Sequence, residues 1–284
     1  MKYGTFITRQ RGEAIVAEVQ HAERLGFESA WIAEHLIMPV KQESVYPYSA
    51  DGRFLVPPDS PFHDPLIVLA YVAAATHRIR LATGIFVVPL RNPFATAKAI
   101  ASLDQLSQGR VTFGVGIGWL KEEFEAVGMT FENRALRTRE YLELMIKLWS
   151  EADPEYQGKT VATRGMKFAP KTVQQPHPPI VFGGTSEPAL RRTVKLGDGW
   201  YGIAHGLEQA RTQIAHLREY ARAAGRTRPI EITLSLRTGK PLTADDVRRM
   251  AELGVDRTLV GLPIKALEGA ELDRFRTAVM DKVP

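Results

Sequence analysis

The amino-acid sequence predicts an α/β fold, a closed (β/α)8 TIM barrel of parallel strands. Short apolar segments alternate with amphipathic helical segments along the chain, eight of each kind. An open doubly wound sheet is the other common solution for this pattern, but eight units in 284 residues favour closure. We expect one domain over residues 1–284, because barrels of about 250 residues routinely form a single unit.

Each expected strand is a short apolar run bounded by turn residues. The runs lie at 2–7, 29–33, 78–88, 111–115, 180–182, 199–203, 231–236 and 256–260. Between them, apolar residues recur at helical spacing, and Gly26, Pro65 and Pro93 mark where individual helices end or begin. The main helices are expected at 13–25, 65–76, 93–106, 133–150, 187–196, 207–221, 243–253 and 265–279.

Two segments depart from the alternation. Residues 36–64 follow the second strand as a long loop rich in Pro, Tyr, Ser and Asp, and a loop at this place can cover the mouth of a barrel. Residues 151–179 form an insertion before the fifth strand, with a short hairpin expected at 160–168. We expect both segments to shape the substrate side of the pocket.

Composition narrows the class of protein. The chain has no cysteine, which excludes disulfides and thiolate metal sites, and together with the lack of a secretory signal this predicts a cytoplasmic location. The longest apolar run, 66–75, is far shorter than the roughly 20 residues of a membrane span. The net charge of +5 comes from scattered Lys and Arg, so we expect no nucleic-acid partner. The surplus can favour an anionic cofactor or substrate, although scattered solvated charge is the simpler interpretation.

The carboxyl ends of parallel strands meet at one rim of a barrel, where these folds hold their chemistry. Glycines are frequent at the expected strand ends, and a glycine lets a flat ligand or a phosphate approach the backbone. The residues expected at this rim are Ile7, His35, Gly84, Ile85, Gly116, Ile117, Gly118, Trp119, Gly183, Gly184, Thr185 and Gly202. His205, just after the sixth strand, can also line the pocket.

His35 ends the second strand and is the candidate catalytic residue, because an imidazole can exchange a proton near neutral pH. A hydrogen-bonded structural histidine is the alternative. Glu34 can orient a group in the pocket or form a buried ion pair. Successive strand residues point to opposite faces, so we do not expect both side chains at the barrel centre unless the strand has ended.

The segment from Gly183 to Ser186 is a strand-to-helix turn, where free N–H groups and the helix dipole favour a phosphate. Thr185 and Ser186 can add hydroxyl donors; the alternative is a tight turn with Ser186 as helix cap. Trp119 can stack on a planar ring or only pack its loop. No metal site is expected: the pair His63-Asp64 lacks a third ligand, and Asp64 before Pro65 is explained as a helix cap.

Several segments resemble the bacterial luciferase-like superfamily of flavin and deazaflavin oxidoreductases, and the resemblance extends over nearly the whole chain. These segments are 26–35 (GFESAWIAEH), 91–93 (RNP) and 103–110 (LDQLSQGR). Three further segments most closely resemble its branch that uses the deazaflavin coenzyme F420, namely 114–124 (GVGIGWLKEEF), 179–184 (PIVFGG) and 198–200 (DGW).

The resemblance implies a barrel with the cofactor in its carboxyl-end mouth and a homodimer as a plausible assembly. It implies that Glu34 contacts the deazaflavin and that His35 has an acid–base or charge-stabilising role. Gly84-Ile85 matches a non-proline cis peptide behind the ring, and Gly183 with Gly184 matches phosphate-binding glycines. Trp119 stands where the sugar-phosphate dehydrogenases of the family have a catalytic glutamate, so their reaction is not carried over.

The function expected from the residues and the resemblance is hydride transfer between coenzyme F420 and an unidentified small organic substrate. His35 would exchange or stabilise the accompanying proton. Two alternatives stay open: an FMN-dependent monooxygenase on the same barrel, and a catalytically silent barrel that only binds a flavin or deazaflavin.

Overall fold

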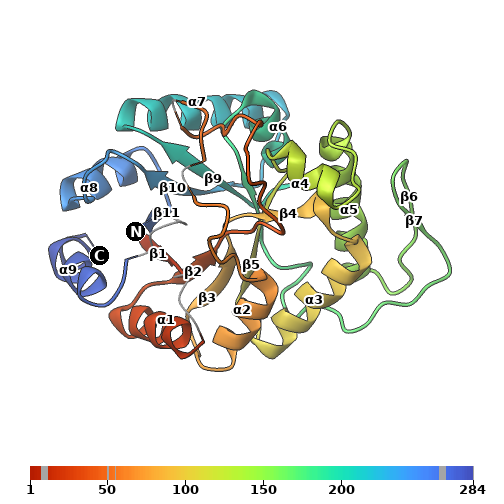
Figure 1. The fold of residues 1–284 in the computed structure, drawn as a ribbon, viewed down its shortest axis with the longest axis horizontal. Coiled ribbons are helices and arrows are strands. Elements are labelled where there is room, and N and C mark those ends of the chain that lie inside the picture. The colour runs from red at the N-terminus through yellow and green to blue at the C-terminus, as the bar shows by residue number, and fades with distance from the viewer. Residues whose placement is uncertain (8–11, 50, 55, 262–266, 284) are drawn as a thin grey trace.

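A computed structural model describes residues 1–7, 12–49, 51–54, 56–261 and 267–283 (Figure 1). Its main sheet is built from apolar segments that are buried along most of their length. The strands are β1 (Lys2–Phe6), β2 (Ser29–Ile32), β3 (Arg80–Thr83), β4 (Phe86–Val87), β5 (Val111–Gly116), β8 (Ile180–Gly183), β9 (Gly199–Ala204), β10 (Glu231–Leu236) and β11 (Arg257–Val260).

The sheet closes on itself. All its described neighbours pair in parallel in the order β3-β2-β1-β11-β10-β9-β8-β5-β4, and a further pairing of β3 with β5 completes the circle. Because β3 and β4 are successive pieces at one position, the nine strands occupy eight positions around the barrel. The closed barrel predicted from the sequence is confirmed.

Helices surround the strands on the outside of the barrel (Figure 1). Those of the described residues are α1 (Glu13–Leu25), α2 (Pro65–Ala73), α3 (Pro93–Leu106), α4 (Lys121–Ala126), α5 (Arg134–Ser150), α6 (Glu187–Leu196), α7 (Leu207–Ala223), α8 (Ala244–Glu252) and α9 (Ala270–Ala278), with 3-10 turns at Val88–Leu90 and Met280–Lys282. In the described ranges, none of these helices has the length and apolar character needed to cross a membrane.

Strand side chains alternate between two buried layers, as the pleat requires. The larger layer lies between strands and helices and includes Trp149 and Trp200, whereas a smaller cluster with Phe6, Trp31 and Leu259 fills the barrel interior. All five side chains are at most 2% exposed, so the barrel is a packed core rather than a pore.

The third strand and the last helix differ most from their expected bounds. The third strand, expected over 78–88, is interrupted at the cis peptide bond Gly84-Ile85 and ends in the 3-10 turn that contains Pro89. The cis bond itself agrees with the resemblance. The last helix begins at Ala270; the expected start at 265 lies outside the described residues.

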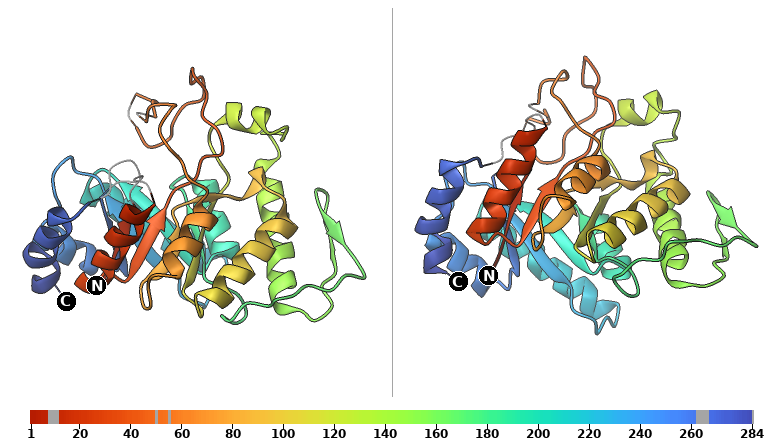
Figure 2. Two further views of the ribbon diagram at one scale, coloured as in Figure 1. Left: turned by 60° about the horizontal axis from the view of Figure 1, so that its bottom comes forward. Right: turned by 90° about the horizontal axis from the view of Figure 1, so that it is seen from below.

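The hairpin of the insertion lies earlier than the expected range 160–168. It consists of β6 (Tyr156–Gln157) and β7 (Ala162–Thr163) and stands out beside α5 (Figures 1 and 2). The backbone N–H groups of Lys159 and Thr160, in its turn, donate to Glu140 of α5 at 3.0 and 2.6 Å. This tertiary contact has no counterpart in the local sequence pattern.

The loop over residues 36–64 rises with α4 from one end of the barrel (Figure 2). Glu122 connects α4 to the loop through hydrogen bonds. Its carboxylate accepts from the N–H groups of Glu43 at 2.6 Å and Ser44 at 3.0 Å, and from the Ser44 hydroxyl. Partial burial raises the pKa of Glu122, but these hydrogen bonds outweigh it and lower the pKa to about 2.

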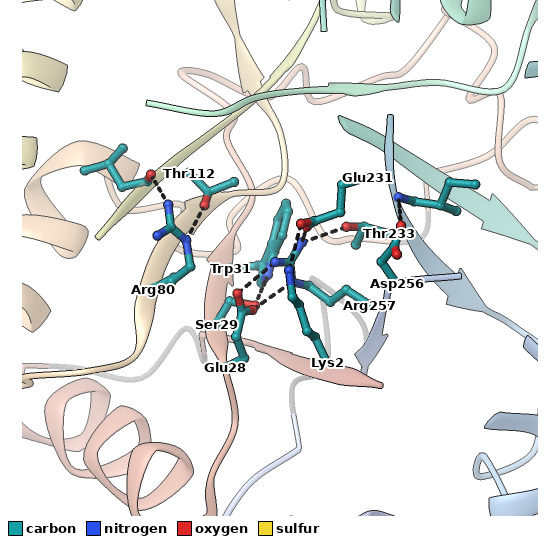
Figure 3. Close-up of polar contacts among 12 residues, drawn as sticks. Lys2, Glu28, Ser29, Trp31, Arg80, Thr112, Glu231, Thr233, Asp256 and Arg257 are labelled. Atoms are coloured by element: carbon teal, nitrogen blue, oxygen red, sulfur yellow. Dashed lines mark hydrogen bonds and ion pairs between the residues drawn. The ribbon is translucent and has the colours of Figure 1, made fainter. Parts of the chain in front are cut away.

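The opposite end of the barrel is closed by a buried charge network (Figure 3). The guanidinium of Arg257, 3% exposed, contacts Glu28 at 2.7 Å, pairs with Glu231, and donates to Thr233 at 3.0 Å. Lys2 reaches Glu231 at 2.8 Å from the neighbouring strand. Burial lowers the pKa of Arg257, but its two carboxylate partners outweigh that effect, so the net shift is upward.

We expect Arg257→Met to lower the free energy of unfolding by about 3–5 kcal/mol, because two carboxylates would lose their buried counter-charge. Urea unfolding measures the loss. Arg248→Met, which removes an exposed ion pair with Asp245, is the matched control and should cost less than about 1 kcal/mol. Equal losses in the two variants would contradict a special role for the buried network.

We expect Glu122→Gln to be less stable than the wild type by about 1 kcal/mol at pH 7, because charged acceptors make the stronger hydrogen bonds. The folded pKa is depressed, so this advantage exists above the ordinary carboxyl pKa of 4.5 and is lost as pH falls toward 2. Urea midpoints at pH 7, 5 and 4 test it, with Glu125→Gln on the same helix as control. A gap that stays constant with pH would argue against the assignment.

Candidate functional site

A cavity of about 850 Å³ opens at the end of the barrel covered by the long loop. It is lined by the candidate residues from separate strand ends, together with parts of the loop and of helices α4 to α6. The structure brings these predicted site residues to it: Glu34, His35, Gly84, Ile85, Gly116, Ile117, Gly118, Trp119, Gly183, Gly184, Thr185 and Ser186. Their roles in binding and catalysis remain predictions.

Three other expected rim residues do not line the cavity. Ile7 is buried in the layer between strands and helices. At Gly202 an added Cβ would lie 2.2 Å from the Trp200 ring, so this glycine serves packing. His205 lies just past the end of β9, and its backbone N–H donates to Gln209 at 2.7 Å.

The glycines of the rim make room first for a protein side chain. A Cβ on Gly116 would lie 2.5 Å from Cδ1 of Ile85, and a Cβ on Gly183 would lie 2.7 Å from Cγ2 of the same isoleucine. Ile85, which follows the cis bond, therefore occupies the space between two strand ends and forms part of the cavity wall. Gly184 has φ +117°, a backbone conformation that other residues rarely adopt.

Glu34 forms the buried ion pair that was one of its two expected roles. It accepts from the Val87 N–H at 2.5 Å and from Arg91 Nε at 2.7 Å. Arg91 also contacts Asp64 at 2.7 Å, and Asp64 caps α2 as predicted. Burial raises the pKa of Glu34 to about 7, against the opposing effects of Arg91 and the Val87 amide.

His35, unlike Glu34, contacts Glu123 of α4. Its Nδ1 lies 3.1 Å from Glu123 Oε2, and Oε1 of the same carboxylate accepts from the Leu36 N–H at 2.6 Å. A carboxylate only accepts, so this contact assigns the proton to Nδ1. Nε2 makes no hydrogen bond with the described residues and is available to a ligand in the cavity. Because β2 ends at Ile32, both Glu34 and His35 can lie at the mouth.

Glu123 is the main residue that sequence reasoning missed. It is 2% exposed and sits inside the short acidic helix α4, among neighbours of the same type. The sequence holds no local signal for it, because only the tertiary contact with His35 distinguishes Glu123 from the neighbouring glutamates.

Aromatic rings form one wall of the cavity. The loop supplies Tyr46, Phe54 and Phe62, which pack against His35 and Trp119 with ring centroids 4.8 to 6.0 Å apart. Most of these pairs meet edge to face or tilted, the arrangement that aromatic quadrupoles prefer. Trp119 thus packs the loop and lines the cavity at the same time.

A cationic region borders the turn from Gly183 to Ser186. Ser186 precedes α6, but its side chain makes no capping hydrogen bond, so the hydroxyl is available to a ligand. Arg192 of α6 lines the same cavity and has neither a hydrogen bond nor an ion pair with the described part of the chain. Burial and the nearby Arg134 lower the pKa of Arg192. Arg192 therefore gives this wall a positive charge that no carboxylate among the described residues neutralises.

Among the described residues, no group of three or more His, Asp or Glu side chains is placed to hold a metal ion. The donors at the cavity are instead hydroxyls, backbone N–H groups and guanidinium groups, which suit an anionic organic ligand.

Comparison with known proteins gives the chain its family. The family model for luciferase-like monooxygenases matches residues 1–273. An uncharacterized protein of Mycobacterium tuberculosis is 34% identical over 276 residues, which cover 95% of each chain. The FMNH2-dependent dimethylsulfone monooxygenase of Pseudomonas putida is 27% identical over 72% of this chain and 53% of its own.

A solved structure shows the same fold. The coenzyme F420 dependent tetrahydromethanopterin reductase from Methanopyrus kandleri superposes with a TM-score of 0.79 at 19% identity, covering 100% of this chain and 99% of that one. The resemblance inferred from the sequence segments is confirmed at the level of the family. The chain belongs to the luciferase-like monooxygenase family of oxidoreductases.

Proposed function

We propose that this protein is an oxidoreductase that transfers a hydride between coenzyme F420 and a small organic substrate at the mouth of the barrel. The observation that carries the proposal is His35, held through Nδ1 by Glu123 and lining a cavity that also contains an uncompensated cationic cradle. The resemblance of segment 114–124 to the F420 branch favours the deazaflavin.

The cradle fits the anionic part of such a cofactor. The N–H groups after Gly183, the hydroxyls of Thr185 and Ser186, and the guanidinium of Arg192 line one part of the cavity, and they would hold a phosphate. Glu34 and Ile85 would border the ring. When bound, the deazaflavin supplies a carbon centre that accepts or donates a hydride, a two-electron reaction.

The protein's own residues would handle the proton and the geometry. When a substrate carbon loses or gains a hydride, the proton on the neighbouring heteroatom would be exchanged at Nε2 of His35. The Glu123 carboxylate would stabilise the imidazolium that forms and would keep the ring in one orientation. The aromatic wall would exclude water and orient the substrate against the reacting ring.

An FMN-dependent monooxygenase is the second candidate. It is favoured by the FMNH2-dependent relative and by a cradle that suits a single phosphate. Titration of the purified protein with F420 and with FMN, followed by anaerobic and aerobic turnover, separates the possibilities. Preferential F420 binding with substrate-dependent reduction supports the proposal; oxygen-dependent turnover with FMN supports the second candidate. Binding without turnover would indicate a silent carrier.

We expect His35→Ala to lower turnover roughly 100- to 10,000-fold while F420 affinity stays within about twofold, because a general acid–base is removed. The substrate for this assay comes from an anaerobic screen of small alcohols and acids for F420 reduction. Glu123→Gln should give a smaller loss and a shifted pH–rate profile, since the amide oxygen can still accept from Nδ1 but lacks the negative charge that stabilises an imidazolium. Full turnover of His35→Ala with bound cofactor would disprove the role.

Arg192→Met should weaken binding of FMN or F420 about 10- to 100-fold, because a charge-assisted contact with phosphate is lost. Riboflavin, and the deazaflavin chromophore without its phosphate-containing tail, should bind the variant and the wild type equally. Arg191→Met is the matched control, since that residue lies on the same helix but is exposed and paired with Glu187. Equal weakening of riboflavin and FMN by Arg192→Met would remove the phosphate assignment.

A further inference from the structure

Arg237 is a further cation that lines the cavity, and the proposed reaction does not use it. It follows β10 directly, and its backbone N–H donates to the Ala204 carbonyl at 2.7 Å, which fixes it at the strand end. Its side chain lines the cavity. The two arginines reach the cavity from different elements, Arg192 from α6 and Arg237 from the end of β10.

No carboxylate lies within ion-pair distance of Arg237 in the described part of the chain, and its buried Nε has no hydrogen-bond partner there. This differs from Arg257 and Arg91, each of which holds two carboxylates. A partly buried guanidinium without a counter-charge is costly unless a ligand supplies one.

The groups around Arg237 cannot supply that charge. Its neighbours are Tyr46, Tyr48 and Tyr201, and burial raises the pKa of all three hydroxyls. Arg237 lowers these pKa values by less than burial raises them, so the tyrosines remain neutral near pH 7. They can donate or accept hydrogen bonds around an anion that the guanidinium holds.

Tyr46 connects Arg237 to the aromatic wall. Its hydroxyl interacts with the Arg237 guanidinium, while its ring centroid lies 4.8 Å from that of Phe54 and 5.0 Å from that of Trp119. Trp119 in turn lies 6.0 Å from His35. A ligand anchored on Arg237 would therefore extend along apolar ring surface toward the imidazole.

We propose that the substrate is a small organic carboxylate, with its carboxylate on Arg237 and its apolar body on the wall of Tyr46, Phe54 and Trp119. A guanidinium binds a carboxylate through two parallel N–H bonds, which gives orientation as well as affinity. The inference rests on the proposed function, since it names the substrate class of the same site. The phosphate cradle at Arg192 stays with the cofactor.

The test uses benzoate as probe and benzamide as its neutral counterpart, titrated calorimetrically into the full chain with and without saturating cofactor. We expect the wild type to bind benzoate roughly tenfold or more tightly than benzamide. Arg237→Met should abolish this preference and leave benzamide unchanged, and Arg237→Lys should keep part of it. Arg53→Met, which removes an exposed cation lining the same cavity, should change the preference less than twofold.

Several results would overturn the inference. The first is a wild type that binds benzoate no more tightly than benzamide. The second is an equal loss of the benzoate preference in the Arg237→Met and Arg53→Met variants. The third is a benzoate preference that is lost in Arg192→Met and kept in Arg237→Met. Weaker cofactor binding by Arg237→Met with unchanged benzoate binding would assign Arg237 to the cofactor. If neither F420 nor FMN binds the wild type, the proposed function fails, while benzoate titration of the cofactor-free chain still tests the anion site. Circular dichroism verifies that each variant is folded.

Discussion

Closure of the barrel, completed where β3 pairs with β5, is the constraint on which every other feature depends. The seam is tight: a Cβ on Gly114 would lie 1.8 Å from the Thr83 carbonyl oxygen, and the Thr83 hydroxyl donates to the Gly114 carbonyl at 2.6 Å. In the closed barrel the carboxyl ends of all the parallel strands lie at one rim. Residues as distant in sequence as His35 and Arg237 therefore line one cavity.

Arg257 at the closed end and two arginines at the mouth, Arg192 and Arg237, differ in whether carboxylates neutralise them. At the closed end, Arg257 is neutralised by two carboxylates and serves to hold strands together. At the mouth, Arg192 and Arg237 have no carboxylate partner among the described residues. The first arrangement stabilises the fold, whereas the second leaves electrostatic attraction for anionic ligands.

Much of this architecture could be predicted from the sequence, because period-two and period-3.6 apolar patterns are local signals. The closed barrel, the cap at Asp64 and the cis bond at Gly84-Ile85 follow from local pattern or resemblance. Glu123 could not be singled out, since its role arises only when α4 meets the end of β2. The hairpin at 156–163 was misplaced for a similar reason, because Glu140 of a distant helix fixes its turn.

The most direct test of the proposed site is a crystal structure of the protein grown with F420. We expect the deazaflavin ring in the cavity beside Glu34 and Ile85, with its phosphate on the turn from Gly183 to Ser186. Nε2 of His35 should face the open side of the ring. A ring bound elsewhere on the surface, or a cavity that stays empty at saturating F420 while FMN fills it, would contradict the F420 assignment.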